Sequence, residues 1–349
     1  MTKTRIATYN VEWMNNLFES GEAAWRTSNT RPMGRIPKDP LVIAERIANV
    51  IREIDADIIG IEEGPALISQ MKLFVKKFLK SEYDVLGSNS HSQNNFALVR
   101  KSLSIEAKLV KEDHRFYALL KRPVTFQPWG EFNAKKRHSM HRPPVLVQLH
   151  KSGSDDVIHV IVAHTKSQFT KGFTNKLFEA RDPDAMKTAI LSRQKLSADI
   201  AAYRRHVTHA IKSREAAGVI LMGDINDGFN RSTFEREFLM QSLVDELRGS
   251  FRRQSALLEH VMEEDQLSKT DAYTVSFRDA ERSNKITKEL IDHILVTPRL
   301  RDQSTWLQLV PGSGRIAHEA SAKHTSNNGK TGDDRPSDHV PVYADFKVK

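Results

Sequence analysis

Four short motifs, spread over the whole chain, place acidic, amide or histidine side chains at the ends of apolar stretches. The motifs are Tyr9-Asn10-Val11-Glu12-Trp13, Ile61-Glu62-Glu63, Gly223-Asp224-Ile225-Asn226 and Ser337-Asp338-His339-Val340-Pro341-Val342. Strand ends of this kind indicate one site that is assembled from several strand tips. Oxygen-rich sites of this type hold a hard divalent cation and support hydrolytic chemistry on phosphate.

Asp224 and Asn226 directly follow an apolar stretch and Gly223. Because side chains two residues apart in extended backbone point the same way, both can reach one ligand. A carboxylate there could orient or deprotonate a water, and a carboxamide could donate to a phosphoryl oxygen. The same residue types also favour Asx-turns and helix N-caps, so this pair indicates a site only together with the other motifs.

The remaining motifs are also ambiguous when each is taken alone. Asp338-His339 is a pair suited to proton transfer or metal binding, although such pairs are common. Glu63 could be an ordinary surface carboxylate at a strand end. Asn10 is poorly suited to a buried strand, so we expect its amide to have a dedicated partner.

The elements that must position these residues alternate between strand and helix patterns. Strands are expected at 6–13, 57–61, 96–99, 105–110, 116–120, 145–149, 157–163, 219–222, 272–277, 289–297, 304–310 and 340–347. Helices are expected at 40–54, 67–79, 183–213, 231–247 and 252–265. No Pro/Gly/Ser-rich linker divides these elements, so residues 1–349 are expected to form a single α/β domain.

Three segments have the composition of insertions into that domain, near 127–144, 166–184 and 312–335. The first is basic, and the second contains several Lys and Phe residues. The third is polar and rich in Gly, Ser and Asn, so it is expected to be a mobile loop that leads into Asp338-His339.

Composition narrows the class of protein. The chain has 349 residues and no cysteine, which excludes disulfides, zinc-thiolate sites and cysteine nucleophiles. No stretch has the ~18–20 apolar residues of a membrane span, and the N-terminus lacks an apolar leader, so a cytoplasmic protein is expected. Lys and Arg outnumber Asp and Glu by 53 to 44, and the formal charge of +9 favours polyanionic partners while also serving solubility.

In their order and context, the motifs resemble those of the endonuclease/exonuclease/phosphatase superfamily, which includes DNase I-like nucleases and abasic-site endonucleases. The resemblance runs from Asn10 to His339 and includes the strand that ends in His164 and the stretch Ile-Asp-His-Ile-Leu-Val at 291–296. It implies a four-layer α/β/β/α sandwich, with two mostly antiparallel sheets flanked by helices and the site at one edge. It also implies hydrolysis of phosphate esters with Mg²⁺ or Mn²⁺ as the cofactor.

By motif, the resemblance implies a set of metal ligands. Glu63 matches the main Mg²⁺ ligand, whereas Glu62 aligns with a position that is usually Gln and is a weaker candidate. Asn10 matches a residue that holds the metal directly or through water. Glu12 matches an acidic position that sometimes contributes, and Asp338 resembles a further acidic member of the metal and water network.

The resemblance also implies roles in the reaction, which would proceed by in-line attack of water. Asp224 matches the residue that orients or activates the water, and Asn226 matches its phosphate-binding neighbour. His339 resembles the catalytic histidine that faces the phosphorus, with Asp292 as the carboxylate that orients it and favours its charged form. His164 would donate to a non-bridging oxygen.

Substrate choice in such scaffolds resides in loops, where the signals are weaker. Arg142 is similar to an Arg near the substrate of DNase-like members, and Lys166 is a second candidate substrate contact. Arg193 and Gln194 fall where many members have an Arg beneath the site. A solvated or structural role fits Arg142 and Arg193 at least as well.

The loops favour a nuclease that acts on DNA or RNA. They contain the basic cluster Lys135-Lys136-Arg137-His138 with His141-Arg142, and Lys166, Lys171 and Lys176 interleaved with Phe169, Phe173 and Phe178. Aromatic rings stack on bases while cations pair with phosphates, although these Phe residues equally fit core or lid packing.

The alternative is a phosphatase or phosphodiesterase of small phosphorylated molecules or lipid headgroups. Polyphosphate-recognition motifs and an exposed hydrophobic hairpin would favour it, and neither is recognisable in the sequence. A non-catalytic binding protein is disfavoured because a competent residue occupies every position expected for catalysis. No protein partner is predicted.

Overall fold

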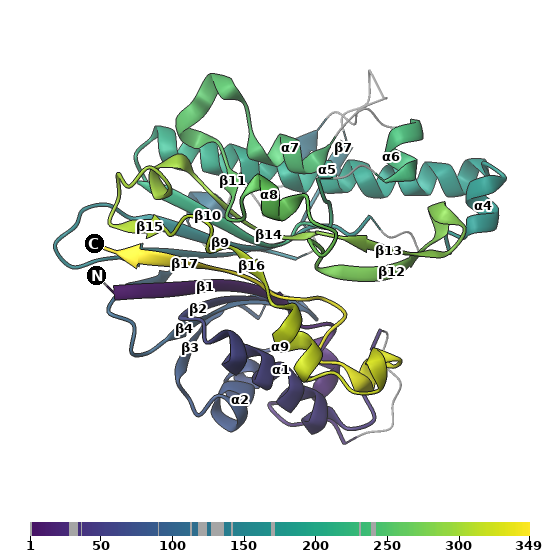
Figure 1. Ribbon diagram of the computed structural model, residues 1–349, viewed down its shortest axis with the longest axis horizontal. Helices are drawn as coiled ribbons and strands as arrows, with labels where there is room; N and C mark the ends of the chain where they lie inside the picture. Colours follow the sequence, from purple (N-terminus) through teal and green to yellow (C-terminus); the bar gives the residue numbers. More distant parts are fainter. Residues whose placement is uncertain are drawn as a thin grey trace.

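In the computed structural model, two central sheets lie face to face and helices cover the outer face of each (Figure 1). This is the four-layer α/β/β/α sandwich that the resemblance implied. The structure describes residues 2–27, 34–35, 37–89, 91–111, 114–117, 124–126, 136–140, 142–168, 172–229, 232–238 and 242–349. None of the helices in these ranges has both the length and the apolar character needed to span a membrane.

The first sheet joins strands from the two ends of the chain. Its order is β15 (Leu307–Leu309), β17 (Val342–Val348), β1 (Thr2–Asn10), β2 (Ile58–Gly64), β4 (Asn94–Arg100) and β3 (Tyr83–Gly87), with β16 (Arg315–Ile316) also on β17. The strands β1 and β2 are parallel, and the other neighbours are antiparallel. The mostly antiparallel pairing is therefore confirmed for this sheet.

The second sheet comes from the middle of the chain. Its order is β11 (Glu259–His260), β14 (Asp292–Val296), β10 (Gly218–Asp224), β9 (Ile158–His164), β8 (Val145–His150) and β5 (Glu106–Leu109). Only β9 and β10 are parallel among its described pairs. Every residue of β9, β10 and β14 is buried, as expected for apolar strands that are covered on both faces.

Three apolar layers hold the sandwich together. Side chains such as Ile6 and Met222 meet between the two sheets. On the outer face of the first sheet, α1 buries Ile47 among the residues beneath it. On the outer face of the second sheet, α5 does the same with Tyr203. Burial of this apolar surface is the main favourable term that fixes the layers.

Several helices and two separate strand pairs complete the described fold. The helices are α1 (Pro40–Ile54), α2 (Ile68–Phe78), α4 (Asn175–Glu179), α5 (Pro183–Lys212), α6 (Thr233–Phe238), α7 (Leu243–Arg248), α8 (Glu264–Leu267) and α9 (His318–Lys323). The 3-10 helices are η1 (Met14–Leu17), η2 (Phe251–Ala256), η3 (Ala280–Arg282), η4 (Pro298–Leu300), η5 (Asn327–Gly329) and η6 (Gly332–Asp334). The strand pairs are β6 (Val124–Phe126) with β7 (Lys136–His138), and β12 (Val275–Asp279) with β13 (Lys285–Glu289).

The structure corrects two of the expected elements. A helix at 252–265 is wrong, because η2, β11 and α8 share that segment and β11 pairs with β14. Pairing with a neighbouring strand has overridden the local helical pattern. The strand expected at 116–120 is also wrong in its described part, since residues 115–117 are helical.

The segment 312–335, expected to be a mobile loop, contains β16, α9, η5 and η6. Arg46 on α1 holds this segment in place, because its guanidinium donates to the carbonyl of His324 at 2.6 Å and to the hydroxyl of Ser326 at 2.9 Å. Composition alone could not reveal these distant partners.

The other two expected insertions are described only in part. The basic side chains of residues 135–137 and His141 lie outside the described residues, as do Phe169 and Lys171. Phe178 is buried in a small cluster with Met186 and Ala189, so packing is its role.

The hairpin of β12 and β13 extends past the second sheet beside α4 and α5 (Figure 1). It exposes Phe277 and Ile286, with relative exposures of 39% and 67%. An exposed hairpin with apolar side chains is therefore present, contrary to the sequence interpretation. Because single apolar residues alternate with Arg and Lys in this segment, the hairpin could not be recognised as hydrophobic from the sequence.

Candidate active site

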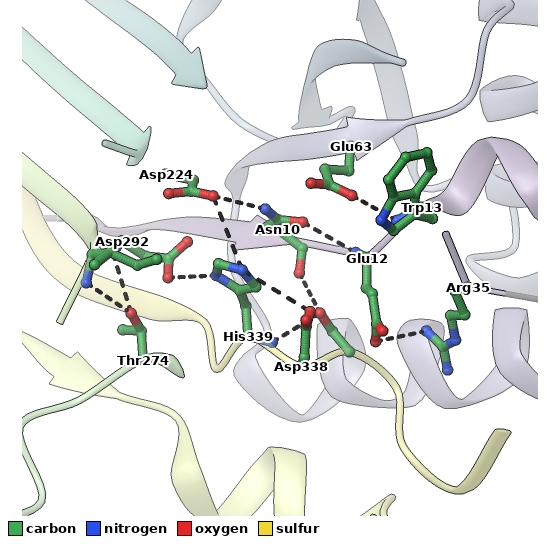
Figure 2. A network of polar contacts seen from close by, with 12 residues as sticks. Asn10, Glu12, Trp13, Arg35, Glu63, Asp224, Thr274, Asp292, Asp338 and His339 are labelled. Carbon is green, nitrogen blue, oxygen red and sulfur yellow. Dashed lines mark hydrogen bonds and ion pairs between the residues drawn. The ribbon is translucent and has the colours of Figure 1, made fainter. Parts of the chain in front are cut away.

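One edge of the sandwich gathers the residues that the motifs singled out (Figure 2). Asn10 ends β1 and Asp224 ends β10, and the amide of Asn10 bridges the two sheets by donating to Asp224 Oδ2 at 3.0 Å. In the second sheet, the register places Asp224 opposite both His164 on β9 and Asp292 on β14. The predicted convergence of strand ends at one sheet edge is therefore what the structure shows.

His339 and Asp292 form a buried ion pair. His339 Nδ1 lies 2.8 Å from Asp292 Oδ2, and both side chains are nearly inaccessible to solvent. Two backbone N–H groups, of Ile291 and Asp292, donate to the hydroxyl of Thr274 at 3.1 and 3.2 Å and fix the start of β14. The backbone N–H of His339 donates to Ser337 Oγ at 3.1 Å.

This pairing decides the charge of His339. Burial on its own lowers the pKa of the imidazole, but the charge and hydrogen bond of Asp292, with Asp338 and Asp224, raise that pKa well above its ordinary value. His339 is therefore held as the imidazolium at neutral pH. Its other nitrogen, Nε2, lies 4.0 Å from Asp224 Oδ2 and 4.0 Å from Asp338 Oδ1.

Asp224 lies at the centre of the polar network. Its Oδ1 accepts the backbone N–H of Asn226 at 2.9 Å, and its Oδ2 lies 3.4 Å from His164 Nε2. Burial, followed by the charge of Asp292, raises the pKa of Asp224 to about 7, although His339 and the two hydrogen bonds oppose that rise. A carboxylate whose pKa is near neutrality is suited to taking a proton from water.

Glu63 projects from an irregularity at the end of β2, where the register with β4 shifts between Ile61 and Gly64. Its Oε2 accepts the backbone N–H of Trp13 at 2.9 Å and the amide of Gln93 at 3.2 Å, and its Oε1 lies 3.9 Å from His164 Nε2. The carboxylate of Glu62 is fully buried and accepts the hydroxyl of Thr8 at 2.8 Å. Burial, then the charges of Asp292 and Asp224, raises the pKa of Glu62 well above its ordinary value.

Several of these side chains project from strained backbone. Glu12, Glu63 and Asn226 all have positive φ angles, of 48°, 56° and 52°. Such conformations cost roughly 1–3 kcal/mol each in a non-glycine residue and cluster at functional sites. Gly223 has a φ of 138°, and a Cβ there would lie 1.8 Å from the carbonyl oxygen of Ala163. Only glycine fits immediately before Asp224.

Glu12 is paired with two guanidinium groups. Arg335 donates to both of its carboxylate oxygens at 2.8 and 3.1 Å, and Arg35 Nη1 lies 3.5 Å from Oε2. Burial, followed by the charge of Asp338, raises the pKa of Glu12, and the two arginines oppose that rise. The carboxylate of Glu12 thus already has partners within the protein, whereas a carboxylate that binds a metal needs an oxygen that is open to the cation.

Arg35 also fixes the segment that carries His339. Its guanidinium is buried and donates to the carbonyl of Pro336 at 2.8 Å and to the carbonyls of Gly332 and Arg335. Directly after this segment, Ser337 donates its hydroxyl to the carbonyl of Asn10 at 2.7 Å. A planar guanidinium with several fixed donors suits this multiple contact.

The two predicted substrate contacts occupy different places. Arg142 Nη1 lies 2.9 Å from His164 Nε2, and its Nη2 donates to Gln93 at 3.3 Å, so Arg142 belongs to the polar network. The ammonium of Lys166 donates to the carbonyl of Ser167 at 2.8 Å, and burial, then the charge of Arg142, lowers its pKa. Asn226 donates its amide to the carbonyl of Thr165 at 3.1 Å.

Some residues of the network carried no recognisable signal in the sequence. Gln93, Thr274, Arg35 and Arg335 belong to loops or short elements without a motif, and their roles depend on partners distant in the sequence. Arg193, placed beneath the site by the resemblance, is buried and pairs with Glu281 at 2.9 Å.

Two groups of side chains could hold a metal. Among the described residues, Asp224, Asp292 and His339 have potential ligand atoms within 4.8 Å of one another. However, two of these residues are already joined to each other, since His339 Nδ1 lies 2.8 Å from Asp292 Oδ2. Glu63 and Asn10 offer oxygen ligands beside the buried Asp224, and oxygen ligands suit Mg²⁺ or Mn²⁺ better than an imidazole does. A cation there would also favour the ionised form of Asp224.

No protein-family model matches the chain, and no curated protein matches it. Solved structures do resemble it. AP endonuclease LMAP from Leishmania major aligns with a TM-score of 0.54 at 12% identity, over 99% of this chain and 88% of that chain. D. rerio TDP2 humanized by 14 mutations aligns with a TM-score of 0.51 at 15% identity, over 99% of both chains. Caenorhabditis elegans TDP2 gives 0.51 at 14% identity, over 99% and 75%. At these identities the likeness concerns architecture, and the chain has the DNase I-like fold.

Proposed function

We propose that the protein is a divalent-metal-dependent phosphodiesterase that cleaves nucleic acid by in-line attack of water. The observation that carries the proposal is the contact of His339 Nδ1 with Asp292 at 2.8 Å, which leaves His339 Nε2 4.0 Å from the buried carboxylate of Asp224. A proton acceptor close to a proton-bearing cation suits the hydrolysis of a phosphate ester.

In the proposed mechanism, Asp224 positions the attacking water and accepts its proton at Oδ2. The amide of Asn10 and the backbone N–H of Asn226 keep the carboxylate in place at 3.0 and 2.9 Å. The imidazolium of His339 donates from Nε2 to a phosphoryl oxygen, and Asp292 preserves its charge. These donors offset the negative charge that develops on the phosphate in the transition state.

Glu63 and Asn10 would hold the metal, with Asp338 contributing directly or through water. When bound, the cation supplies Lewis-acid stabilisation of negative charge on the phosphate. Glu12 serves in this proposal as the anchor of Arg335 and Arg35. His164 Nε2 lies 2.9 Å from Arg142 Nη1, and in this proposal the two side chains together bind a non-bridging oxygen of the phosphate.

Nucleic acid is the substrate class that the other observations favour. The formal charge of +9 suits a polyanion, and one solved structure with the same fold is named AP endonuclease. The cations Arg278, Lys285 and Lys288 lie on the hairpin that exposes Phe277 and Ile286 beside the site. Cations beside an exposed aromatic ring, such as that of Phe277, are typical of surfaces that bind single strands.

An activity screen with purified protein and Mg²⁺ tests the proposal. Plasmid DNA, single-stranded DNA, RNA, inositol phosphates and a minimal phosphodiester would be incubated with wild type and with Asp224→Asn. We expect cleavage of nucleic acid that EDTA removes and Mg²⁺ or Mn²⁺ restores, and Asp224→Asn should lower turnover at least ~10²-fold. Hydrolysis of inositol phosphates without cleavage of nucleic acid would favour the small-phosphate alternative. Full activity after exhaustive chelation would exclude the metal.

The salt dependence of binding tests the basic segment near 127–144. Replacing Lys135, Lys136 and Arg137 with Ser should weaken polynucleotide binding and reduce the log–log salt slope by about 0.7–0.9 for each phosphate group that the variant no longer neutralises. Affinities at several salt concentrations would be measured in Ca²⁺ to limit cleavage. Identical slopes for wild type and variant would show that this segment does not bind the polyanion.

A further inference from the structure

A pocket of about 430 Å³ adjoins the candidate active site and shares Asn226 and Asp338 with it. The hairpin of β12 and β13 forms much of its other wall, with Phe277 and Glu289, while Phe173 lies on the side of α4 and α5. This volume falls within the range of pockets that bind small ligands or parts of larger ones. The mechanism proposed above uses none of the pocket's hairpin residues.

The two phenyl rings give the pocket apolar surfaces. Phe277 is 39% exposed, although large apolar side chains are usually buried in a folded protein. Phe173 is half-buried and rests on Phe178, with ring centroids 6.1 Å apart. Rings that are held in place and partly open to solvent can stack on a planar ligand, and nucleobases bind single-strand proteins in this way.

Glu289 is the polar group that distinguishes this pocket. Neighbouring carboxylates are engaged: Glu281 pairs with Arg193 at 2.9 Å, and Asp279 accepts the hydroxyl of Thr287 at 3.2 Å. Within the described residues, the carboxylate of Glu289 has no hydrogen bond or ion pair. Burial, then the charges of Asp279, Glu235 and Glu281, raises its pKa to about 7. A half-buried acceptor without a donor is expected to gain one from a ligand.

We propose that this pocket binds the nucleobase next to the scissile phosphate and that Glu289 selects bases with an exocyclic amino group. The inference rests on the proposed nuclease function and names the part of the substrate that the site distinguishes. Adenine, cytosine and guanine carry an amino group on their hydrogen-bonding edge, as a Glu side chain requires for a short contact. Uracil and thymine lack this group, and their single donor on that edge, N3–H, lies between two carbonyl oxygens that would face the acidic wall.

Binding of nucleoside monophosphates to the Mg²⁺-loaded protein tests the pocket directly. Calorimetric titration would compare the 3′ and 5′ monophosphates of adenosine, cytidine, guanosine and uridine. We expect the uridine monophosphates to bind about tenfold more weakly than the other three, because the loss of one hydrogen bond to a charged group lowers affinity on that scale. Glu289→Met should remove this difference, while Glu106→Met, on the exposed strand β5, should retain it. Equal binding of all four bases to wild type would overturn the proposal.

The stacking surface needs its own variants. Phe277→Ala should weaken the binding of all four monophosphates by about tenfold, since stacking on a phenyl ring is not base-specific. Phe251→Ala removes an aromatic ring that is 82% exposed on η2 and should leave the affinities unchanged. Unaltered binding by Phe277→Ala would contradict the role of the hairpin.

Cleavage of short oligonucleotides separates failure of the pocket from failure of the proposed function. Single-stranded substrates would contain one amino-bearing base at successive positions in a uridine or thymidine tract. We expect cleavage to concentrate next to that base in wild type and to spread evenly in Glu289→Met. Uniform cleavage by wild type would overturn the pocket and leave the nuclease function standing. If oligonucleotides are not cut, the nuclease function fails, and the monophosphate titrations still decide the pocket.

Discussion

Buried histidines in two regions of the molecule differ in charge. His339 lies at the sheet edge, and its pKa is raised well above the ordinary value. His159 on β9 and His206 on α5 lie in the layer between the second sheet and that helix, with their rings stacked 5.7 Å apart. Burial is the main cause that lowers the pKa of His159 to about 4 and of His206 to about 3.

The difference shows that burial does not decide the state of a histidine on its own. All three side chains are almost fully inaccessible to solvent, with residue exposures of 9% or less. His339 has a carboxylate at 2.8 Å, whereas His206 packs its ring edge-on against Phe116 at 4.4 Å between centroids. His159 and His206 form a neutral pair within the core, whereas His339 carries a charge because Asp292 lies beside it.

The largest expected effect comes from removing that carboxylate. Asp292→Asn should lower the pKa of His339 toward that of a buried imidazole, because the main charge that opposes burial is lost and only Asp338 and Asp224 remain to raise it. We expect turnover at neutral pH to fall at least ~10²-fold, as for loss of a charge-stabilising group, and His339→Ala to fall at least as far. The pH–rate profile of Asp292→Asn should move toward lower pH, where His339 regains its proton.

Two measurements accompany these variants. Melting curves should show folded protein, and His206→Phe, which alters the neutral pair, should retain wild-type turnover at neutral pH. Near wild-type turnover for Asp292→Asn on the true substrate would contradict the role assigned to the ion pair.

A smaller effect is expected from altering the position of His339 while keeping its charge. Arg35→Met removes a buried guanidinium that donates to Pro336 and to two further carbonyls just before Ser337. We expect the turnover number to fall about tenfold with little change in KM, because misplacement of a catalytic group weakens mainly the transition state. Steady-state kinetics below the melting temperature would measure both constants.

Arg46→Met is the matched control for that experiment. Arg46 also donates its guanidinium to a backbone carbonyl of the same C-terminal segment, at His324, which lies 15 residues before His339 in the sequence. It should lower stability without lowering turnover. Addition of free guanidinium should partly restore Arg35→Met and not affect Arg46→Met. Equal loss of turnover in both variants would mean that Arg35 only stabilises the fold.

The strands that carry the motifs and the gathering of the motif residues were predictable because their signals are local, whereas the four-layer sandwich was implied only by the resemblance to a family. An apolar run followed by Asp224 or His164 identifies a strand and its end from the residues themselves. The order of the motifs along the chain then indicated one site, and the structure brings Asn10, Glu63 and Asp292 to it. The catalytic and metal-binding roles assigned to these residues stay predictions.

Interactions between distant loops were not predictable in the same way. The arginines that satisfy Glu12 lie 23 and 323 residues away in the sequence, in segments without a motif. The pairing of Glu12 with these arginines was therefore not predicted, and its role as a metal ligand stays a prediction. The helix expected at 252–265 failed for a related reason, because pairing of β11 with β14 depends on a strand elsewhere in the chain.

The smallest effect on turnover is expected from the neutral histidine pair, which should instead control stability in acid. The folded pKa values of about 4 and about 3 lie below the ordinary value of 6.5, so the unfolded chain takes up protons first as the pH falls. The stability that the neutral pair retains above pH ~6.5 should therefore be lost progressively toward pH ~4 and below. Replacing His206 with Phe should reduce this loss by on the order of 1–2 kcal/mol between pH 7 and pH 5. Urea unfolding of wild type and His206→Phe at several pH values would measure it, and identical pH dependence would mean that the pair is not neutral in the folded protein.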